Sequence, residues 1–315
     1  MKRVVTILLF LQCIFHNEVY TQNSLSSLTS ADRPKIGLVL GGGGAKGAAE
    51  VGVLLALEEA GLQFDYITGT SIGSIIGALY SCGYRAKEIE TLFLSQSWLK
   101  LLTDTGNRRS RRHRGRHSDS DGEGNQDEID GIGLSRGEQV VELFDSLTRQ
   151  SSDIEFDSLP IPFRCVATEL RTQEQVILKS GSLPLAMRAS MSIPGMFKPV
   201  HLNGQTLVDG GMQNNLPVDV VKDMGAEYVI AIDLSQAKHT PRNFSLKETF
   251  GIGGILDWVV SRPDWSQHEA NVKATDLYIK PDLNGYDAMD FQKEKIEKMI
   301  AIGYATAKQV LSEKF

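Results

Sequence analysis

Ser71 lies in a motif whose residue types could support nucleophilic catalysis. The stretch Gly69-Thr70-Ser71-Ile72-Gly73 has the G-x-S-x-G pattern and falls between a predicted strand and a predicted helix. In this context a sharp turn exposes the serine hydroxyl, and Gly69 and Gly73 leave room for close contact between the strand and the helix. The alternative is an ordinary glycine-rich turn in which the serine is incidental.

A carboxylate that could activate this serine occurs far along the chain. An Asn-Gly dipeptide within residues 198–209 predicts a β-hairpin with a two-residue turn. The hairpin ends in the motif Asp209-Gly210-Gly211. If Asp209 comes within hydrogen-bond distance of Ser71, it can accept the hydroxyl proton directly and act as the base. The alternative is a turn aspartate that caps its own backbone.

A third motif could stabilise negative charge. It lies between a predicted strand and a predicted helix, where glycines leave backbone N–H groups accessible and the helix N-terminus adds partial positive charge. The residues of this glycine loop are Gly42, Gly43, Gly44, Lys46 and Gly47. The loop predicts an anion site, but it does not by itself define which anion is bound.

Two nucleotide-binding interpretations of the glycine loop are poorly supported. A phosphate-binding P-loop requires Ser or Thr after Gly-Lys, whereas Lys46 is followed by Gly47. A dinucleotide-binding fold requires an acidic residue about 20 residues after the glycines, at the end of a strand. Asp65 lies near that distance, but it begins a predicted strand instead of ending one.

Taken in this order, the three motifs resemble the patatin-like phospholipase family. The stretches 188–197 and Asn215-Leu216-Pro217 are also similar to family patterns, and the resemblance covers residues 34–285. It points to bacterial, exported members of the family. It implies a three-layer α/β sandwich with a mainly parallel central sheet, and hydrolysis of the acyl esters of lipids.

The resemblance also implies a role for each motif. Ser71 is the nucleophile, Asp209 is its base, and the glycine loop, with the amides of 42–44, is the oxyanion hole. The implied partner is a lipid or fatty-acyl ester, as for a phospholipase A or a lysophospholipase. No His, Cys and Asp cluster has the spacing of metal ligands, so we expect neither a metal nor a cofactor.

Four residues in the stretch 188–197 are candidate walls of an acyl-chain pocket. They are Ser190, Met191, Ile193 and Phe197. Apolar side chains near a reactive serine would favour a fatty-acyl chain. The alternative is that these side chains only pack the loop.

Two other functions remain open at the level of the sequence. An α/β-hydrolase with a Ser–Asp–His triad requires a histidine after the acid, and His239 and His268 qualify by position alone. A lipid- or nucleotide-binding module without turnover would leave Ser71 inert. Labelling of Ser71 by a fluorophosphonate probe separates that module from an enzyme.

The sequence around these motifs predicts alternating strands and helices. Strands are expected at 36–40, 64–68, 163–168 and 228–232, and helices at 48–60, 72–81, 139–148 and 290–312. The pattern Ser135-Arg-Gly-Glu138 predicts a capping box at the start of the helix 139–148. Strands that alternate with helices indicate a layered α/β domain with a mainly parallel sheet.

Composition limits the class of protein. A length of 315 residues allows one large domain or two small ones, and 41% hydrophobic with 23% charged residues is typical of soluble globular chains. There are 33 basic and 39 acidic residues, and the net charge of −6 argues against a nucleic-acid partner. Nothing in the sequence indicates the oligomeric state.

The N-terminal segment predicts export. Lys2 and Arg3 precede a short apolar run over 4–15, which is typical of a signal peptide, and we place that peptide at 1–21. The mature chain is then expected to be periplasmic, associated with the outer membrane or secreted. A flexible lead-in is predicted over 22–33, and a single hydrolase domain over 34–315.

A charged insertion interrupts the predicted domain. Residues 108–130 contain six arginines followed by six acidic residues, with almost no apolar side chain, so we expect a disordered loop. One interpretation is that its basic half contacts anionic lipid headgroups at a membrane surface. The alternative is a solvated loop whose two halves neutralise each other.

Overall fold

A computed structural model describes residues 25–103, 135–148, 153–236 and 265–315 of the chain. The predicted signal peptide (1–21) and charged loop (108–130) lie outside these residues. Among the described helices, none has the length and apolar character that crossing a membrane requires.

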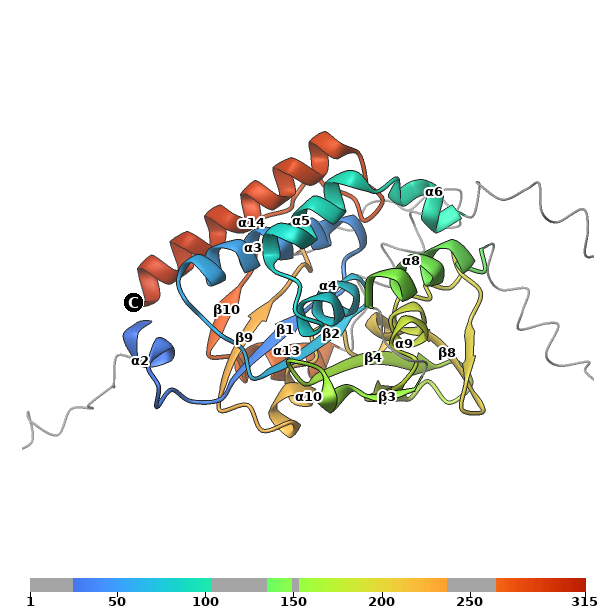
Figure 1. Cartoon of the computed structure of the whole chain (residues 1–315), viewed down its shortest axis with the longest axis horizontal. Coiled ribbons are helices and arrows are strands. Elements are labelled where there is room, and N and C mark those ends of the chain that lie inside the picture. The colour runs from blue at the N-terminus through green and yellow to red at the C-terminus, as the bar shows by residue number, and fades with distance from the viewer. Residues whose placement is uncertain (1–24, 104–134, 149–152, 237–264) are drawn as a thin grey trace, which may run out of the picture.

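In the described part of the chain, ten strands form a central sheet and a small second sheet, which Figure 1 shows in outline. The strands are β1 (Ile36–Leu40), β2 (Tyr66–Thr70), β3 (Ile154–Glu155), β4 (Phe163–Glu169), β5 (Gln175–Leu178), β6 (Ser180–Gly181), β7 (Val200–Leu202), β8 (Gln205–Asp209), β9 (Tyr228–Ile232) and β10 (Leu277–Ile279). The central sheet has the order β10-β9-β1-β2-β4-β8-β7, with β5 also paired to β4, and β3 pairs with β6.

Most of the central sheet is parallel. Strands β10, β9, β1, β2 and β4 run in one direction, whereas β5, β7 and β8 are antiparallel to their neighbours. Because β1 and β2 are adjacent and parallel, the loops that follow them emerge at the same edge of the sheet. The glycine loop follows β1 and the Ser71 turn follows β2, so the topology brings these two motifs together.

Helices cover both faces of the sheet (Figure 1). They are α2 (Leu25–Thr29), α3 (Ala48–Glu59), α4 (Ile72–Ser81), α5 (Ala86–Ser95), α6 (Trp98–Thr103), α8 (Glu138–Thr148), α9 (Leu183–Ser190), α10 (Val218–Asp223), α13 (Trp265–Lys273) and α14 (Lys293–Lys314). Helices α3, α4 and α14 lie on one face, and α10 and α13 lie on the other.

Strand β1 shows how one strand contributes to both layers of the core. All five of its residues are buried. Leu38 and Leu40 join the large apolar cluster on the α3 and α4 side, whereas Val39 joins a separate cluster with Val218 and Val221 on the α10 side. Successive side chains of a strand point to opposite faces, so a continuous apolar run is what a strand between two helical layers requires.

Several elements agree with their sequence predictions. The strands at 36–40 and 228–232 and the helix at 72–81 have the predicted bounds, and the hairpin is formed by β7 and β8. Asn203 and Gly204 both have positive φ (53° and 76°), as the two-residue turn requires. The predicted α/β class with a mainly parallel sheet is confirmed.

The strand predicted at 64–68 is displaced by two residues, because β2 is Tyr66–Thr70. Phe64 packs its ring edge-on against Tyr80, with 5.9 Å between the ring centroids. The Asp65 carboxylate accepts a hydrogen bond from the backbone N–H of Ile36 and pairs with Arg33. These tertiary contacts hold Phe64 and Asp65 outside the strand.

Two local predictions are wrong. Helix α8 begins at Glu138, so Ser135 is not its cap; its hydroxyl instead accepts from the N–H of Gly137, two residues on. The predicted flexible lead-in contains helix α2, and Leu28 in this helix is fully buried in the main core. Burial of one leucine side chain stabilises a structure by about 1.5–3 kcal/mol, which orders a segment that is otherwise polar.

Candidate active site

Strand register places Ser71 and Asp209 at the same level of the sheet. Thr70, the last residue of β2, pairs with Val166 of β4, and the next residue of β4, Ala167, pairs with Asp209 of β8. Ser71 follows β2 directly, so the serine and the aspartate lie on either side of β4. The two residues are 138 positions apart in the sequence.

Ser71 forms a sharp turn between β2 and α4. Its backbone has φ 53° and ψ −121°, a conformation that costs a non-glycine residue about 1–3 kcal/mol. Gly73, in the first turn of α4, allows the helix to approach β1, because a Cβ atom there would lie 2.3 Å from the carbonyl oxygen of Leu40. The turn directs the Ser71 hydroxyl toward Asp209 while leaving the residue 6% exposed.

Asp209 ends strand β8, and its two carboxylate oxygens have different partners. Oδ2 accepts a hydrogen bond of 2.7 Å from the Ser71 hydroxyl, and Oδ1 accepts one of 2.7 Å from the Gly211 N–H. Asp209 is 1% exposed, and this burial raises its pKa to about 6, although the bonds from Ser71 and Gly211 act in the opposite direction. A carboxylate with this pKa is a stronger base than an ordinary aspartate.

Within the glycine loop, the amides of Gly42 and Lys46 are already engaged. The Gly42 N–H donates to the carbonyl oxygen of Asn215 (3.1 Å), and the Asn215 side-chain amide donates to the carbonyl oxygen of Gly42 (3.1 Å). The Lys46 N–H donates to the Gly43 carbonyl oxygen. Gly47 packs against Ile72, since a Cβ atom at Gly47 would lie 2.3 Å from that side chain. Two of the five residues predicted for anion binding, Gly42 and Lys46, therefore have N–H groups that are already hydrogen bonded within the protein.

The amides of Gly43 and Gly44 differ from their neighbours. The described backbone hydrogen bonds of this loop are donated by Gly41, Gly42, Ala45 and Lys46, and none is donated by Gly43 or Gly44. Gly44 also lines the same pocket as Ser71. Within the glycine loop, these two N–H groups donate no described backbone hydrogen bond.

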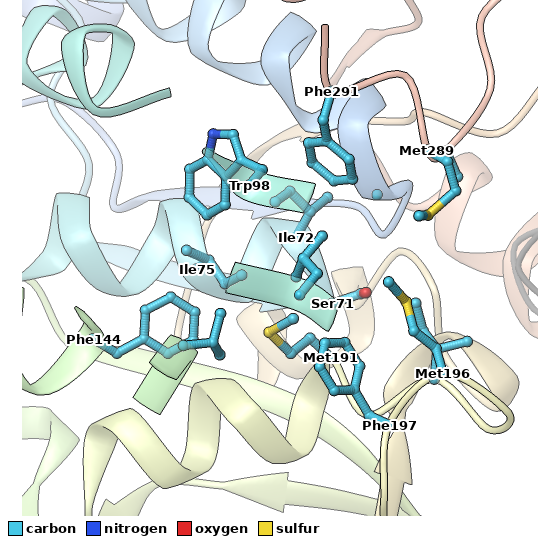
Figure 2. Close-up of a pocket in the computed structure, with 15 residues that line it drawn as sticks. Ser71, Ile72, Ile75, Trp98, Phe144, Met191, Met196, Phe197, Met289 and Phe291 are labelled. Carbon is cyan, nitrogen blue, oxygen red and sulfur yellow. The ribbon is translucent and has the colours of Figure 1, made fainter. Parts of the chain in front are cut away.

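An apolar pocket opens beside the Ser71 hydroxyl (Figure 2). It encloses about 450 Å³ of space, part of it continuous with solvent. Its larger side chains come from α4, α6, α8 and two loops: Ile75, Trp98, Phe144, Met191, Met196 and Phe291. Figure 2 shows Ile75 and Phe144 on the side of the pocket away from the Ser71 hydroxyl. Ser71 supplies the one hydroxyl group among the residues that line it.

Three of the four residues predicted to line an acyl pocket do line it, and the fourth does not. Met191, Ile193 and Phe197 line the pocket. Ser190 is fully buried behind the Ser71 turn, where its hydroxyl donates to Val166 and accepts from the Ser71 N–H. Its small polar side chain is used in backbone contacts, so the prediction for Ser190 is corrected.

Sequence reasoning missed most of the pocket wall. Trp98, Phe144 and Phe291 come from segments that no motif connects to Ser71. A weak signal existed for one of them, because Val140 and Phe144 share a face of the predicted helix at the spacing of buried residues. The role of Asn215 in holding Gly42 was also missed, although the residue was noted in the stretch after the aspartate motif.

The histidine-triad alternative finds no support in the described residues. The hydroxyl of Ser71 donates to Asp209, and neither residue has a histidine partner there. His268 instead lies 3.3 Å from Asp233, measured from Nε2 to Oδ2. The other candidate, His239, lies outside the described residues.

A serine on a strand-to-helix turn, hydrogen bonded to a buried carboxylate, has the arrangement that a serine nucleophile and its base require. Comparison with known sequences gives the particular family. A sequence profile described as patatin-like phospholipase matches residues 38–222, which is more than half of the chain. The chain belongs to the patatin-like phospholipase family.

Individual relatives agree with this assignment. The chain is 31% identical over 308 residues to patatin-like phospholipase domain-containing protein 6 of Mus musculus, covering 87% of this chain and 20% of that protein. It is 29% identical over 305 residues to lysophospholipase NTE1 of Meyerozyma guilliermondii, covering 88% of this chain and 19% of that protein. The chain thus spans about a fifth of the length of these relatives. Both are eukaryotic, so they do not support the expectation of a bacterial, exported protein.

A solved structure has a similar fold. VipD from Legionella pneumophila superposes with a TM-score of 0.51 at 15% sequence identity, and the match covers 90% of this chain and 68% of VipD. At this level of identity the similarity concerns the fold alone.

Proposed function

We propose that this protein is a serine acyl hydrolase that cleaves the acyl esters of phospholipids or lysophospholipids. The observation that carries the proposal is the 2.7 Å hydrogen bond from the Ser71 hydroxyl to the buried Asp209 carboxylate, at an apolar pocket. Family membership and the names of the relatives support the lipid substrate class.

In the first half of the reaction, Ser71 Oγ attacks the ester carbonyl carbon while its proton moves to Asp209 Oδ2. The tetrahedral intermediate then collapses, the bond to the alcohol breaks, and the alcohol leaves with the proton from Asp209. The serine now carries the acyl group. The elevated pKa of Asp209 suits this exchange, since proton transfer is most effective when the pKa of the base is near the working pH.

The negative charge on the carbonyl oxygen requires hydrogen-bond donors. We assign this role to the N–H groups of Gly43 and Gly44, because those of Gly42 and Lys46 are engaged within the protein. One such donor contributes roughly 2.7–4 kcal/mol to stabilisation of the transition state in comparable sites. This assignment narrows the predicted oxyanion hole from five residues to two.

In the second half, water attacks the acyl-enzyme and gives a proton to Asp209. Collapse of the second tetrahedral intermediate releases the fatty acid, and the proton returns from Asp209 to Ser71 Oγ. The free enzyme is restored with no net change in its protons. This route needs one serine and one carboxylate, in agreement with the contacts of Ser71 in the described residues.

The pocket favours an acyl chain as the group that is retained on the serine. Its walls are aliphatic and aromatic side chains, which would bury methylene groups at about 0.8 kcal/mol each. A long acyl chain therefore gains more from this pocket than a short one. The pocket does not distinguish a phospholipid from a lysophospholipid, because both carry the same acyl group.

The experiment that tests the proposal combines probe labelling with product analysis. A fluorophosphonate should label the wild-type chain and not Ser71→Ala, and mass spectrometry of mixed phospholipids and lysophospholipids should show fatty acid release by wild type alone. Labelling that persists in Ser71→Ala would contradict Ser71 as the nucleophile. A wild-type chain that binds lipid vesicles without labelling or turnover would instead indicate a non-catalytic module.

Two further predictions concern the place of action. Export through residues 1–21 and contact of the basic half of 108–130 with anionic lipids both rest on segments outside the described residues. We retain both as proposals. Sedimentation with vesicles of anionic or neutral lipid, with and without residues 108–116, tests the second, since electrostatic binding should weaken as salt is added.

A further inference from the structure

We propose that Ser190 is a positioning residue that holds the Ser71 backbone in its reactive conformation. This inference rests on the proposed function, because it concerns how the same site is kept ready for attack. Ser190 is the last residue of α9 and lies 119 positions from Ser71 in the sequence.

The Ser190 hydroxyl makes two hydrogen bonds at once. Its oxygen accepts from the backbone N–H of Ser71 (3.0 Å), and its own hydrogen is donated to the carbonyl oxygen of Val166 (2.6 Å). Val166 belongs to β4, the strand next to β2. Ser190 therefore ties the nucleophile turn to the neighbouring strand through one fully buried side chain.

The backbone of Ser71 needs such support. Its φ of 53° and ψ of −121° are unfavourable for a residue with a side chain, and such strain persists where surrounding contacts hold it. The N–H of Ser71 lies at the start of the unusual turn, so a fixed acceptor there restricts rotation of the peptide. The direction of the Ser71 hydroxyl follows from this backbone conformation.

The same short segment also contacts the base. The carbonyl oxygen of Ser192 accepts from the backbone N–H of Asp209 (3.0 Å). Met191, between the two serines, lines the acyl pocket. Residues 190–192 thus touch the nucleophile, the base and the pocket, and the relative position of Ser71 and Asp209 depends on this segment.

The segment is itself held firmly. Ser192 Oγ donates to the Arg188 carbonyl oxygen and accepts from the Arg188 guanidinium, which is 1% exposed. That guanidinium also lies over the ring of Phe197, 4.3 Å from its centroid. A hydroxyl carried by such a fixed segment can impose a position on Ser71 instead of following it.

Loss of the hydroxyl has a specific consequence for the reaction. In Ser190→Ala, the Ser71 N–H and the Val166 carbonyl oxygen lose a partner in a buried site, and the strained turn can relax. A misplacement of about 1 Å at a reacting group can reduce a rate about 100-fold. The acyl pocket is unchanged, so binding should be affected much less than reaction.

The test measures how fast a long-chain fluorophosphonate inactivates the purified full chain, with its binding constant and its maximal rate constant separated. Ser190→Ala should lower the maximal rate constant about 10- to 100-fold and leave the binding constant within about threefold. Ser190→Thr keeps the hydroxyl and should recover most of the rate. Ser81→Ala is the matched control, because Ser81 is equally buried at the far end of α4 and its hydroxyl has no hydrogen-bond partner among the described residues.

A rate constant for Ser190→Ala within twofold of the Ser81→Ala value would overturn the inference while leaving the proposed function intact. If thermal melting shows that Ser190→Ala does not fold, Ser190→Cys takes its place, because a thiol is a weak acceptor; a wild-type rate in that variant would also overturn the inference. A wild-type chain that the probe never labels would overturn the proposed function, and this inference with it.

Discussion

The hydroxyl of Ser71 donates a 2.7 Å hydrogen bond directly to Asp209, with no histidine between them among the described residues. The carboxylate is buried, and its pKa is raised to about 6. Burial that strengthens this base also has a cost, because a carboxylate that ionises in a buried site loses its hydration. Activity and stability should therefore change in opposite directions when Asp209 is altered.

The variant Asp209→Asn removes the proposed base while keeping nearly the same shape. Hydrolysis should fall by about 10²–10⁴-fold, the usual contribution of a general base. The free energy of unfolding should rise at pH 8, by up to about 3 kcal/mol for a pKa near 6 against an ordinary value of 3.8. Ester turnover and urea denaturation check the two parts, and a variant that keeps wild-type turnover would contradict the dyad.

The pH dependence of this stability difference has a defined sign. Folding raises the pKa of Asp209, so the folded chain binds its proton up to a higher pH than the unfolded chain. The stability of the wild type relative to Asp209→Asn should fall as the pH rises from about 4 to about 6, and then level off. An advantage of Asp209→Asn that was largest at pH 4 would contradict the pKa shift.

The pH profile of catalysis should report the ionisation of Asp209 as well. Because Asp209 must be ionised to accept the Ser71 proton, kcat/KM should decrease below a pH of about 6 and be nearly constant above it. Hydrolysis of a neutral p-nitrophenyl ester between pH 4 and 8 gives this profile without titration of the substrate. An acidic limb near pH 4 would indicate an aspartate with an ordinary pKa.

Gly44 provides a test of the proposed oxyanion hole. Its φ is +59°, and a Cβ atom there would lie 2.4 Å from the carbonyl oxygen of Ala288, so Gly44→Ala must displace the glycine loop. Turnover should fall about 10²–10³-fold through the loss of a donor. Gly61→Ala is the matched control, since Gly61 also has a positive φ (+78°), but a Cβ atom there would meet only Thr29 at an ordinary contact distance of 3.7 Å, and Gly61 has no place in the site.

Turnover by the two glycine variants should be compared at a temperature at which both are folded, as judged by circular dichroism. The control should lose stability through backbone strain, about 1–2 kcal/mol, and keep its activity. Equal activity in the two variants would mean that the Gly44 amide takes no part in the reaction.

The pocket predicts selectivity for acyl-chain length. Ile75 lies on the side of the pocket away from the Ser71 hydroxyl, and Ile75→Phe should fill that part of it (Figure 2). For p-nitrophenyl esters, kcat/KM should fall at least about 10-fold for a twelve-carbon chain and change little for a four-carbon chain, because only the long chain reaches this region. An equal loss for both esters would contradict the pocket as the acyl site.

Substitution of His268 distinguishes a Ser–Asp dyad from a Ser–Asp–His triad. Although burial alone would raise the pKa of Asp233, the hydrogen bond from His268, the charge of Lys280 and the hydroxyl of Tyr278 lower it to about 2. His268→Ala should therefore destabilise the fold by about 1–3 kcal/mol and preserve ester hydrolysis. Loss of hydrolysis in a folded His268→Ala, comparable to that in Ser71→Ala, would favour a histidine mechanism.

Elements could be predicted where residues close in the sequence decide the local structure. Strand β1 and helix α4 have the bounds that their apolar runs and glycines indicated, and the Asn-Gly turn forms the hairpin that ends at Asp209. The pairing of Ser71 with Asp209 is implied by the resemblance to the patatin-like family, but the motif in which each residue stands is local. In such cases the determining contacts lie within a few residues, so the local pattern contains the information.

Other features depend on segments that only the fold brings together. The amide of Gly42 is engaged by Asn215, 173 positions away, and this removes it from the set of free donors. The pocket combines side chains from α4, α6, α8 and the loops at 191–197 and 288–291, and Ser190 turns out to hold Ser71 instead of lining that pocket.

Local sequence patterns therefore specify the chemical groups of the site and the turns that present them. Contacts between distant segments specify which amides of the glycine loop are engaged, which side chains line the pocket and how far the pKa of Asp209 is raised. The physical reason is that burial and hydrogen-bond partners are properties of contacts between distant segments, and local patterning does not encode them.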